Sequence, residues 1–187
     1  TFERMPLGAS SGRSPRLREE GVYLITGGTG GIGLVLAKFL ATAYRARLIL
    51  TTRHGLPPRG EWAARARESD HVARKIQLVA ELEACGAEVL VAAADVTDET
   101  AMRAVVDQAA SRWGRVDGVV HAAGVPGGGM LQLKTPEAAA AVLAPKVVGT
   151  RVLAKVLQGR EPDFLLLCSS LTGILGGVGQ VDYCAAN

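Results

Sequence analysis

The second half of the chain holds side chains whose types and spacing could deliver a proton to a carbonyl oxygen. Ser169-Ser170 ends an apolar run, Tyr183 lies thirteen positions past Ser170, and Asn187 lies four past Tyr183. Residues i and i+4 share one face of a helix, so we expect Tyr183 and Asn187 to point together into a cleft. Carbonyl reduction needs a hydride donor, a proton donor and a group that polarises the oxygen, and tyrosine can be the acid.

Lys146 is the candidate for the cation that such a tyrosine needs. A tyrosine hydroxyl has an unperturbed pKa of about 10, and a nearby positive charge eases the loss of its proton. Lys146 lies in Ala144-Pro145-Lys146-Val147-Val148-Gly149, within a helical pattern. The prediction requires that this helix lines the same cleft. Taken singly, a serine, tyrosine or lysine is more often structural or solvated than catalytic, and the spacing alone does not bring these residues together.

A glycine cluster near the start of the chain indicates where a hydride donor would bind. The apolar run Val22–Thr26 stops at Gly27, and Gly28-Thr29-Gly30-Gly31-Ile32-Gly33 then fits G-x-G-x-x-G just before a helical pattern. The early glycines permit a tight turn and a close approach to a pyrophosphate, and the last permits close helix–strand packing. The helix N-terminus offers unpaired N–H groups to the phosphates. Strand, glycines and helix in this order predict a dinucleotide site.

Arg53 and Asp95 follow the second and third apolar runs and bear on which dinucleotide binds. An NAD-preferring site usually carries an acid about 20 residues beyond the glycines, for the ribose 2′-OH. Arg53 stands there instead, and a guanidinium suits the 2′-phosphate of NADPH; an ordinary surface arginine is the alternative. In Ala94-Asp95-Val96-Thr97-Asp98, Thr97 or Asp98 is the expected cap of the next helix. Asp95 is then left to face the adenine, or to have a purely structural role in the turn.

Strands and helices alternate from Gly21 onward. Five β-prone apolar runs are predicted as strands: Val22–Thr26, Arg47–Thr52, Glu88–Ala93, Gly118–His121 and Phe164–Cys168. Helical patterns between them cover Leu34–Ala43, about Ser69–Ala84, about Glu99–Trp113 and about Pro136–Leu157. Such alternation implies right-handed βαβ crossovers. The predicted fold class is therefore α/β, a Rossmann-like doubly wound parallel sheet with helices on both faces.

The predicted domain organisation is a connector over residues 1–20 and a cofactor-binding catalytic subdomain over residues 21–187. Proline, glycine and serine among charges give the connector the composition of a link from an upstream structural subdomain. A doubly wound dinucleotide fold usually has six or more strands, and the pattern contains five. We therefore expect the subdomain to be incomplete at its C-terminus.

The composition of the 187 residues bounds the class of protein. Hydrophobic residues make up 48% and aromatic residues 4%, as in layered α/β proteins with cores of Ala, Val and Leu. The net charge is +3, and basic residues alternate with acids from Arg65 to Lys75, a run expected to be a solvated helix face; we expect no nucleic-acid partner. No apolar run approaches the roughly 18 residues of a membrane span, so no membrane partner is expected. Cys85, Cys168 and Cys184 lack disulfide or metal spacing, which favours a reduced cytoplasmic protein with buried thiols and no metal.

Together the motifs resemble the short-chain dehydrogenase/reductase superfamily, through Thr26-Gly27-x-x-x-Gly31-Ile32-Gly33 followed by Ser170 and Tyr183. Ordinary members have Tyr-x-x-x-Lys where this chain has Tyr183-x-x-x-Asn187, and they tend to have asparagine where this chain has Lys146. That Lys/Asn exchange resembles the ketoreductase (KR) domains of modular type I polyketide synthases. Further matches are Gly21-Val22-Tyr23-Leu24-Ile25-Thr26-Gly27-Gly28, His121-Ala122-Ala123-Gly124 and Gly179-Gln180-Val181-Asp182-Tyr183-Cys184-Ala185-Ala186-Asn187.

The resemblance implies reduction of a β-ketoacyl chain by NADPH. The chain would be tethered through phosphopantetheine to an acyl carrier protein, beside neighbouring polyketide synthase domains. Tyr183 would donate the proton, Ser170 would hydrogen-bond the carbonyl oxygen, Lys146 would lower the pKa of Tyr183, and Asn187 would help hold the relay. The expected cofactor contacts are Gly27, Thr29, Gly30, Gly31, Ile32, Arg53, Asp95, Val96, Ala122, Ala123 and Gly124, the last three on the nicotinamide side. His121 is expected to be a packed residue and not a ligand.

Two markers of product configuration in this family are absent. Many members with one configuration carry Leu-Asp-Asp where this chain has Pro126-Gly127-Gly128, and members with the other often have tryptophan where it has Leu175. The resemblance therefore implies no configuration for the product. The rival hypotheses are a stand-alone 3-ketoacyl or alcohol reductase, a scaffold domain that kept the fold without the chemistry, and a nucleotide-binding regulator, which would bind the cofactor without any carbonyl substrate. Asn187 and the connector argue against the first, and the four intact site residues argue against the second.

Overall fold

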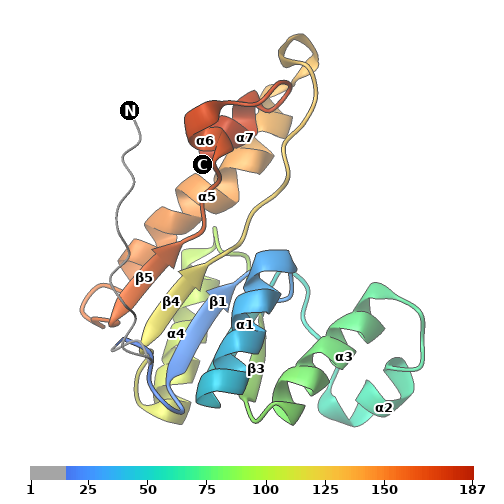
Figure 1. The fold of residues 1–187 in the computed structure, drawn as a ribbon, viewed down its shortest axis with the longest axis vertical. Helices are drawn as coiled ribbons and strands as arrows, with labels where there is room; N and C mark the ends of the chain where they lie inside the picture. The colour runs from blue at the N-terminus through green and yellow to red at the C-terminus, as the bar shows by residue number, and fades with distance from the viewer. Residues whose placement is uncertain (1–15) are drawn as a thin grey trace.

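A five-stranded parallel sheet lies at the centre of the computed structural model, which describes residues 16–187 (Figure 1). The strands follow the order β3-β2-β1-β4-β5 across the sheet. Their bounds are β1 (Val22–Thr26), β2 (Arg47–Thr52), β3 (Glu88–Ala93), β4 (Gly118–His121) and β5 (Phe164–Leu167). The predicted strands are confirmed, except that β5 ends one residue earlier than expected. The predicted fold class is confirmed as well.

Helices cover both faces of this sheet. α1 (Gly31–Tyr44) and α3 (His71–Ala84) lie on one face, and α4 (Glu99–Trp113) and α5 (Pro136–Val156) lie on the other. The helix expected at Tyr183 is α7 (Val181–Ala186). Short elements that the pattern did not predict are α2 (Trp62–Arg65), α6 (Thr172–Leu175) and the 3₁₀ turns Arg59–Glu61 and Leu131–Leu133.

Alternate residues of the strands enter two separate cores. In β1, Val22 and Leu24 join the apolar cluster under α4 and α5, whereas Tyr23 and Ile25 join the cluster under α1 and α3. Successive side chains of a strand point to opposite faces of a sheet, so an unbroken apolar run fills both cores. This double burial makes β1 the rigid centre from which the glycine turn extends.

β1 also marks the point where the order of the strands reverses. It pairs with β2 on one side and with β4 on the other, both in parallel. The connections leaving the two carboxyl ends therefore diverge, and open α/β sheets bind ligands in the crevice formed there. α5 extends past this edge of the sheet, and its upper part packs against α7, which also contacts α6 (Figure 1).

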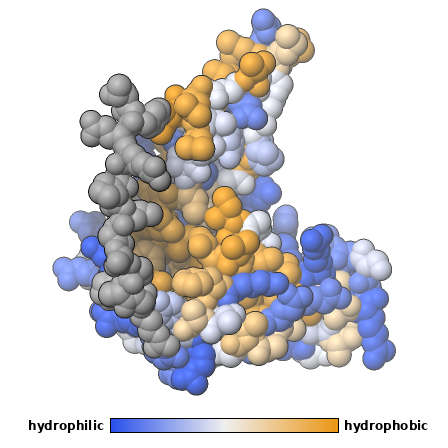
Figure 2. All heavy atoms as spheres, viewed as in Figure 1, coloured by the Kyte–Doolittle hydropathy of each residue, from blue (hydrophilic) through white to orange (hydrophobic). Residues whose placement is uncertain are grey.

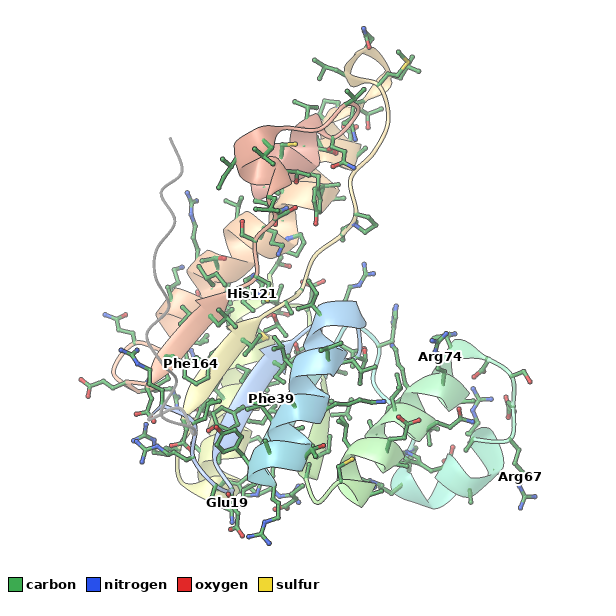
Figure 3. All side chains as sticks on the ribbon, in the orientation of Figure 1. Glu19, Phe39, Arg67, Arg74, His121 and Phe164 are labelled. Atoms are coloured by element: carbon green, nitrogen blue, oxygen red, sulfur yellow. The ribbon has the colours of Figure 1, made fainter. Side chains whose placement is uncertain are left out.

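The run from Arg65 to Lys75 is not the single solvated helix face that was expected. Asp70 accepts hydrogen bonds from two backbone N–H groups of the first turn of α3 and so begins a new helix inside the run. An N-cap residue has extended backbone, so one helix cannot continue through it. Arg67 and Arg74 in this run still face solvent (Figure 3).

β5 forms one edge of the sheet and is poorly covered. Leu165, Leu166 and Leu167 are 39%, 45% and 47% exposed. Because neighbouring strand residues point to opposite faces, three exposed leucines in a row leave both faces of β5 open. In the space-filling view, apolar residues gather in the middle of the molecule, around α1 (Figure 2).

The three cysteines are free thiols. The expectation that all are buried is wrong for Cys85, which is exposed at the end of α3, while Cys168 and Cys184 are half-buried. Within residues 16–187, no helix has the length and apolar character that crossing a bilayer requires.

Most of the predicted connector, residues 1–15, lies outside the described part of the chain. The last residues before β1 are tied to the sheet by charge: Arg18 contacts Asp163 at 2.7 Å and Asp117 at 3.5 Å. Asp117 is buried, accepts the N–H of Val22 at 2.8 Å and pairs with Arg115 at 2.9 Å. This carboxylate therefore joins the start of β1 to the start of β4.

We predict that Asp117→Ala destabilises the fold. The change leaves the buried N–H of Val22 without its acceptor, which costs about 2 kcal/mol in the free energy of unfolding. Urea unfolding would measure it. The matched control is Lys38→Ala, which breaks an exposed pair with Glu81 and should cost less than about 1 kcal/mol. Equal losses in the two variants would contradict the prediction.

Candidate functional site

The turn between β1 and α1 has the geometry of a phosphate-binding turn. Gly27 has φ +65°, and a Cβ there would lie 2.9 Å from the Cα and N of Ala123, so both the conformation and the space require glycine. A Cβ at Gly33 would lie 2.5 Å from the carbonyl oxygen of Gly27, which explains the last glycine of the motif. The N-cap Gly30 has no side chain to occupy the N–H groups of the fourteen-residue α1. These N–H groups are available to an anion.

A cleft of about 470 Å³ opens beside this turn. Eight of the eleven expected cofactor residues line it: Gly27, Thr29, Gly30, Arg53, Asp95, Val96, Ala123 and Gly124. Gly31, Ile32 and Ala122 do not line it; Gly31 and Ile32 lie in the first turn of α1, and Ala122 lies just past β4. Sequence reasoning missed the further lining residues Thr51, Thr52, His54, Lys75, Ala94, Thr97, Val125, Ala141, Ala144 and Pro145.

Two cations line the same cleft. Arg53 directly follows β2, and Lys75 lies in α3. The ammonium of Lys75 lies 3.3 Å from the hydroxyl of Thr52, which donates to the carbonyl of His54 at 2.7 Å. Lys75 comes from α3, more than twenty positions along the chain, and no spacing motif marks it. Helical periodicity could have placed it on one side of α3, but only the packing of α3 against the sheet brings it to the cleft.

Asp95 has a structural role in the turn after β3, which was one of the two roles expected for it. Its Oδ1 accepts the backbone N–H of Thr97 at 2.9 Å and the hydroxyl of Thr97 at 2.7 Å. These bonds, with the charge of Arg53, hold the pKa of Asp95 below its usual range. Asp98 caps α4 by accepting the N–H of Ala101 at 3.0 Å, as expected for one of the two candidate caps. Asp95 also lines the cleft, so one carboxylate serves the turn and faces the site.

His121 is packed as expected, but it also connects β1 to α5. It is buried at the end of β4, beside α5 (Figure 3). Its Nε2 lies 2.9 Å from the carbonyl oxygen of Pro145, so this nitrogen donates, and Nδ1 accepts from the hydroxyl of Thr26 at 2.6 Å. Burial lowers the pKa of His121. A neutral imidazole therefore joins the glycine turn to the residue that precedes Lys146.

Lys146 lies between the wall of the cleft and the end of β5. A Cβ on Gly124 would lie 3.1 Å from Cε of Lys146, and the ammonium donates to the carbonyl oxygen of Cys168. Burial lowers the pKa of Lys146, and the charge interaction with Cys168 opposes that shift. The helix of Lys146 contributes Ala141, Ala144 and Pro145 to the cleft. The residues that line the cleft do not include the four candidate catalytic residues, Lys146, Ser170, Tyr183 and Asn187.

The remaining candidates lie on the segments next to Lys146. Ser170 Oγ accepts from the hydroxyl of Thr172 at 2.9 Å, which leaves its own proton available to an acceptor. Asn187 Nδ2 donates to the carbonyl of Tyr183 at 2.9 Å, and its buried Oδ1 has no partner among the described residues. Ser169 donates to the backbone carbonyl of Asn187 at 2.6 Å, which holds the end of α7 against the end of β5.

These residues fit a dinucleotide. The glycine turn leaves room and free N–H groups for a pyrophosphate, and the first turn of α1 contains no acidic residue to repel it. Arg53 and Lys75 supply positive charge to the cleft, and Gly124 adds a part of its lining without a side chain.

We predict that His121 makes folding stability depend on pH. The unfolded chain binds a proton at this histidine near pH 6.5, whereas the folded protein, with a lowered pKa, does so only at lower pH. Stability should therefore fall as the pH drops from about 7 to 5, and His121→Gln should flatten that part of the profile. Urea midpoints at several pH values would test this. The exposed His71→Gln is the control, and an unchanged profile in His121→Gln would contradict the prediction.

Comparisons with known proteins agree with this geometry. The family model described as KR domain matches residues 21–187. The chain is 40% identical over 172 residues to the 6-methylsalicylic acid synthase of Aspergillus terreus, which covers 91% of this chain and 10% of that protein. It is 36% identical to an N-terminal ketoreductase from the macrolactin assembly line, with a TM-score of 0.79 over 94% of this chain and 33% of that chain.

A ketoreductase domain from the bacillaene assembly line gives the same identity, 36%, and the same TM-score, 0.79, over 91% of this chain and 37% of that one. The chain thus spans a tenth of the length of the synthase and about a third of each solved ketoreductase chain. Because the family model covers everything from residue 21 onward and the solved relatives share the sheet, the chain belongs to the KR domain family of polyketide synthases, with the short-chain dehydrogenase/reductase fold.

Proposed function

We propose that the chain is the cofactor-binding part of an NADPH-dependent ketoreductase, which reduces the β-keto group of an acyl chain held on an acyl carrier protein. The observation that carries the proposal is the position of Gly124. It lines the dinucleotide cleft, and a Cβ at this position would lie 3.1 Å from Cε of Lys146. The cleft for a hydride donor and the group that tunes the proton donor therefore meet at one residue.

The preference for NADPH rests on Arg53 and Lys75. Two cations at one end of the cleft suit a doubly charged 2′-phosphate, and Arg53 can bind it in a bidentate fashion. Asp95, the nearest carboxylate in the cleft, is engaged with Thr97 through Oδ1 and interacts with the charge of Arg53. The two cations favour a ribose that carries a 2′-phosphate over one with a free 2′-OH.

In the proposed reduction of the keto group, each site residue has one role. When bound, reduced nicotinamide supplies the hydride to the keto carbon. Ser170, whose proton is not used within the described residues, donates a hydrogen bond to the keto oxygen. Tyr183 donates its phenolic proton to the same oxygen, and the ammonium of Lys146 stabilises the phenolate that remains. The Oδ1 atom of Asn187 has no partner among the described residues. It can accept a hydrogen bond from the group that returns a proton to Tyr183.

The relatives support the carrier-protein part of the proposal. They include polyketide synthases and assembly-line ketoreductases, of which this chain spans a part. A substrate delivered on a phosphopantetheine arm, and neighbouring synthase domains as partners, belong to that proposal. A stand-alone reductase would act equally well on free thioesters, and this difference can be measured.

We predict that Tyr183→Phe lowers kcat for a short β-ketoacyl thioester by about 10²-fold or more, because the acid is lost while the binding surface stays. NADPH consumption by the full-length protein is the measurement. Binding of NADPH, followed by its fluorescence, should change less than about twofold. Cys184→Ala, one position along α7, is the matched control. A native protein that binds NADPH without turnover would mean that the fold is a scaffold.

We also predict a loss of NADPH preference in Arg53→Ala and Lys75→Gln. Each change removes one cation near the expected 2′-phosphate, so the Kd of NADPH should rise about tenfold while that of NADH changes little. Titrations with both cofactors would measure this. Arg74→Ala, a neighbour of Lys75 that faces solvent, is the control. Equal weakening of NADH and NADPH would show that the two cations do not read the 2′-phosphate.

A further inference from the structure

A buried ion pair outside the cleft joins two segments that are far apart in the sequence. The ammonium of Lys134 lies 2.6 Å from Oδ2 of Asp182 and 2.5 Å from the carbonyl oxygen of Gly128. The side chains are 7% and 1% exposed. Lys134 ends the loop of residues 126–134 between β4 and α5, and Asp182 lies in α7, directly before Tyr183.

Asp182 is bonded on both of its oxygens. Oδ1 accepts the backbone N–H of Tyr183 at 2.9 Å, while Oδ2 takes the ammonium of Lys134. These bonds hold the pKa of Asp182 below its usual range, with Lys134 as the largest cause. The carboxylate is therefore a charged bridge between the loop and the backbone of Tyr183.

Glycines in the loop bring the two segments into direct contact. A Cβ on Gly127 would lie 2.6 Å from Cβ of Tyr183 and 2.8 Å from Oδ1 of Asp182. At the other end of the contact, a Cβ on Gly179 would lie 3.4 Å from the carbonyl oxygen of Gly129. The loop backbone thus lies against the start of α7, with no side chain between them.

α7 depends on such contacts for its orientation. It has six residues, and its N-cap Gln180 makes no side-chain capping bond. A helix this short does not hold itself together in water. The hydroxyl of Tyr183 makes no hydrogen bond to any other described residue, so its position is set by the helix that carries it.

We propose that the Lys134–Asp182 pair is a positioning device that fastens the loop of residues 126–134 to α7 and so fixes Tyr183 relative to the cofactor cleft. The proposal rests on the proposed reductase function. A buried pair adds little stability over apolar residues of the same volume, because desolvation offsets the attraction. What it adds is a unique geometry, since each charge can be satisfied only with the loop and the helix in register.

The decisive variant is Lys134→Met with Asp182→Asn in the full-length protein. It removes both charges, leaves no buried charge unpaired, and keeps an oxygen to accept the N–H of Tyr183. We expect kcat for a β-ketoacyl thioester to fall at least about tenfold, with KM for the thioester and Kd for NADPH within about twofold of native. Lys134→Arg, which keeps the charge, should retain kcat within about threefold. The control is the exposed pair Lys38→Met with Glu81→Gln.

Amide hydrogen exchange tests the pair without any turnover. In the double variant, amides of 127–133 and of α7 should exchange at least about tenfold faster together, while those of β1 and β2 stay as in the native protein. Native kcat and native exchange in the double variant would overturn the proposal. If native protein binds NADPH but does not turn over, the proposed function fails, and the exchange comparison alone then decides whether the pair joins loop and helix.

If the double variant does not fold, the Asp182→Glu variant tests the proposed role of the pair instead. It keeps both charges and lengthens the bridge by one methylene. A folded Asp182→Glu protein with kcat lowered about fivefold or more, and NADPH binding unchanged, would support the proposal. The same protein with native kcat would overturn it.

Discussion

The close approach of the Gly27 turn to the end of β4 is the constraint on which the site depends. Only glycine can occupy position 27, because a Cβ would strike the backbone of Ala123, and Thr26 and His121 seal the same junction with a 2.6 Å hydrogen bond. The turn that would hold phosphates and the wall that would hold the reacting end are thereby one rigid unit. His121 also contacts the carbonyl oxygen of Pro145 in α5. The backbone next to Lys146 is therefore tied to the glycine turn.

Elements built on local patterns could be predicted from the sequence, and contacts between distant segments could not. The strands are apolar runs that end at residues such as Thr26, Thr52 or His121, and their predicted bounds were nearly correct. α2 and α6, of four residues each, carry too few turns to show a period. Lys75 and Lys134 are ordinary lysines in the sequence. Only the packing of α3 brings Lys75 to the cleft, and only the packing of α7 brings Asp182 to Lys134.

Polar groups of several kinds lie in and around the cleft. Arg53 and Lys75 line it, Asp95 is held ionised by its turn, and His121, outside the lining, is kept neutral by burial. Lys146, also outside the lining, has a pKa that burial lowers and donates to the carbonyl of Cys168. A fixed arrangement of this kind needs little rearrangement when charge develops on a substrate, which is how a preorganised polar site lowers a barrier.

The open β5 edge has a consequence for what can pair with it. Among the described residues, β5 joins the sheet only through β4, and its three leucines are exposed on both faces. An unpaired apolar strand edge is a template on which another strand can add through backbone hydrogen bonds. The sheet can therefore be extended at β5, by a strand of the same polypeptide or of a neighbouring chain.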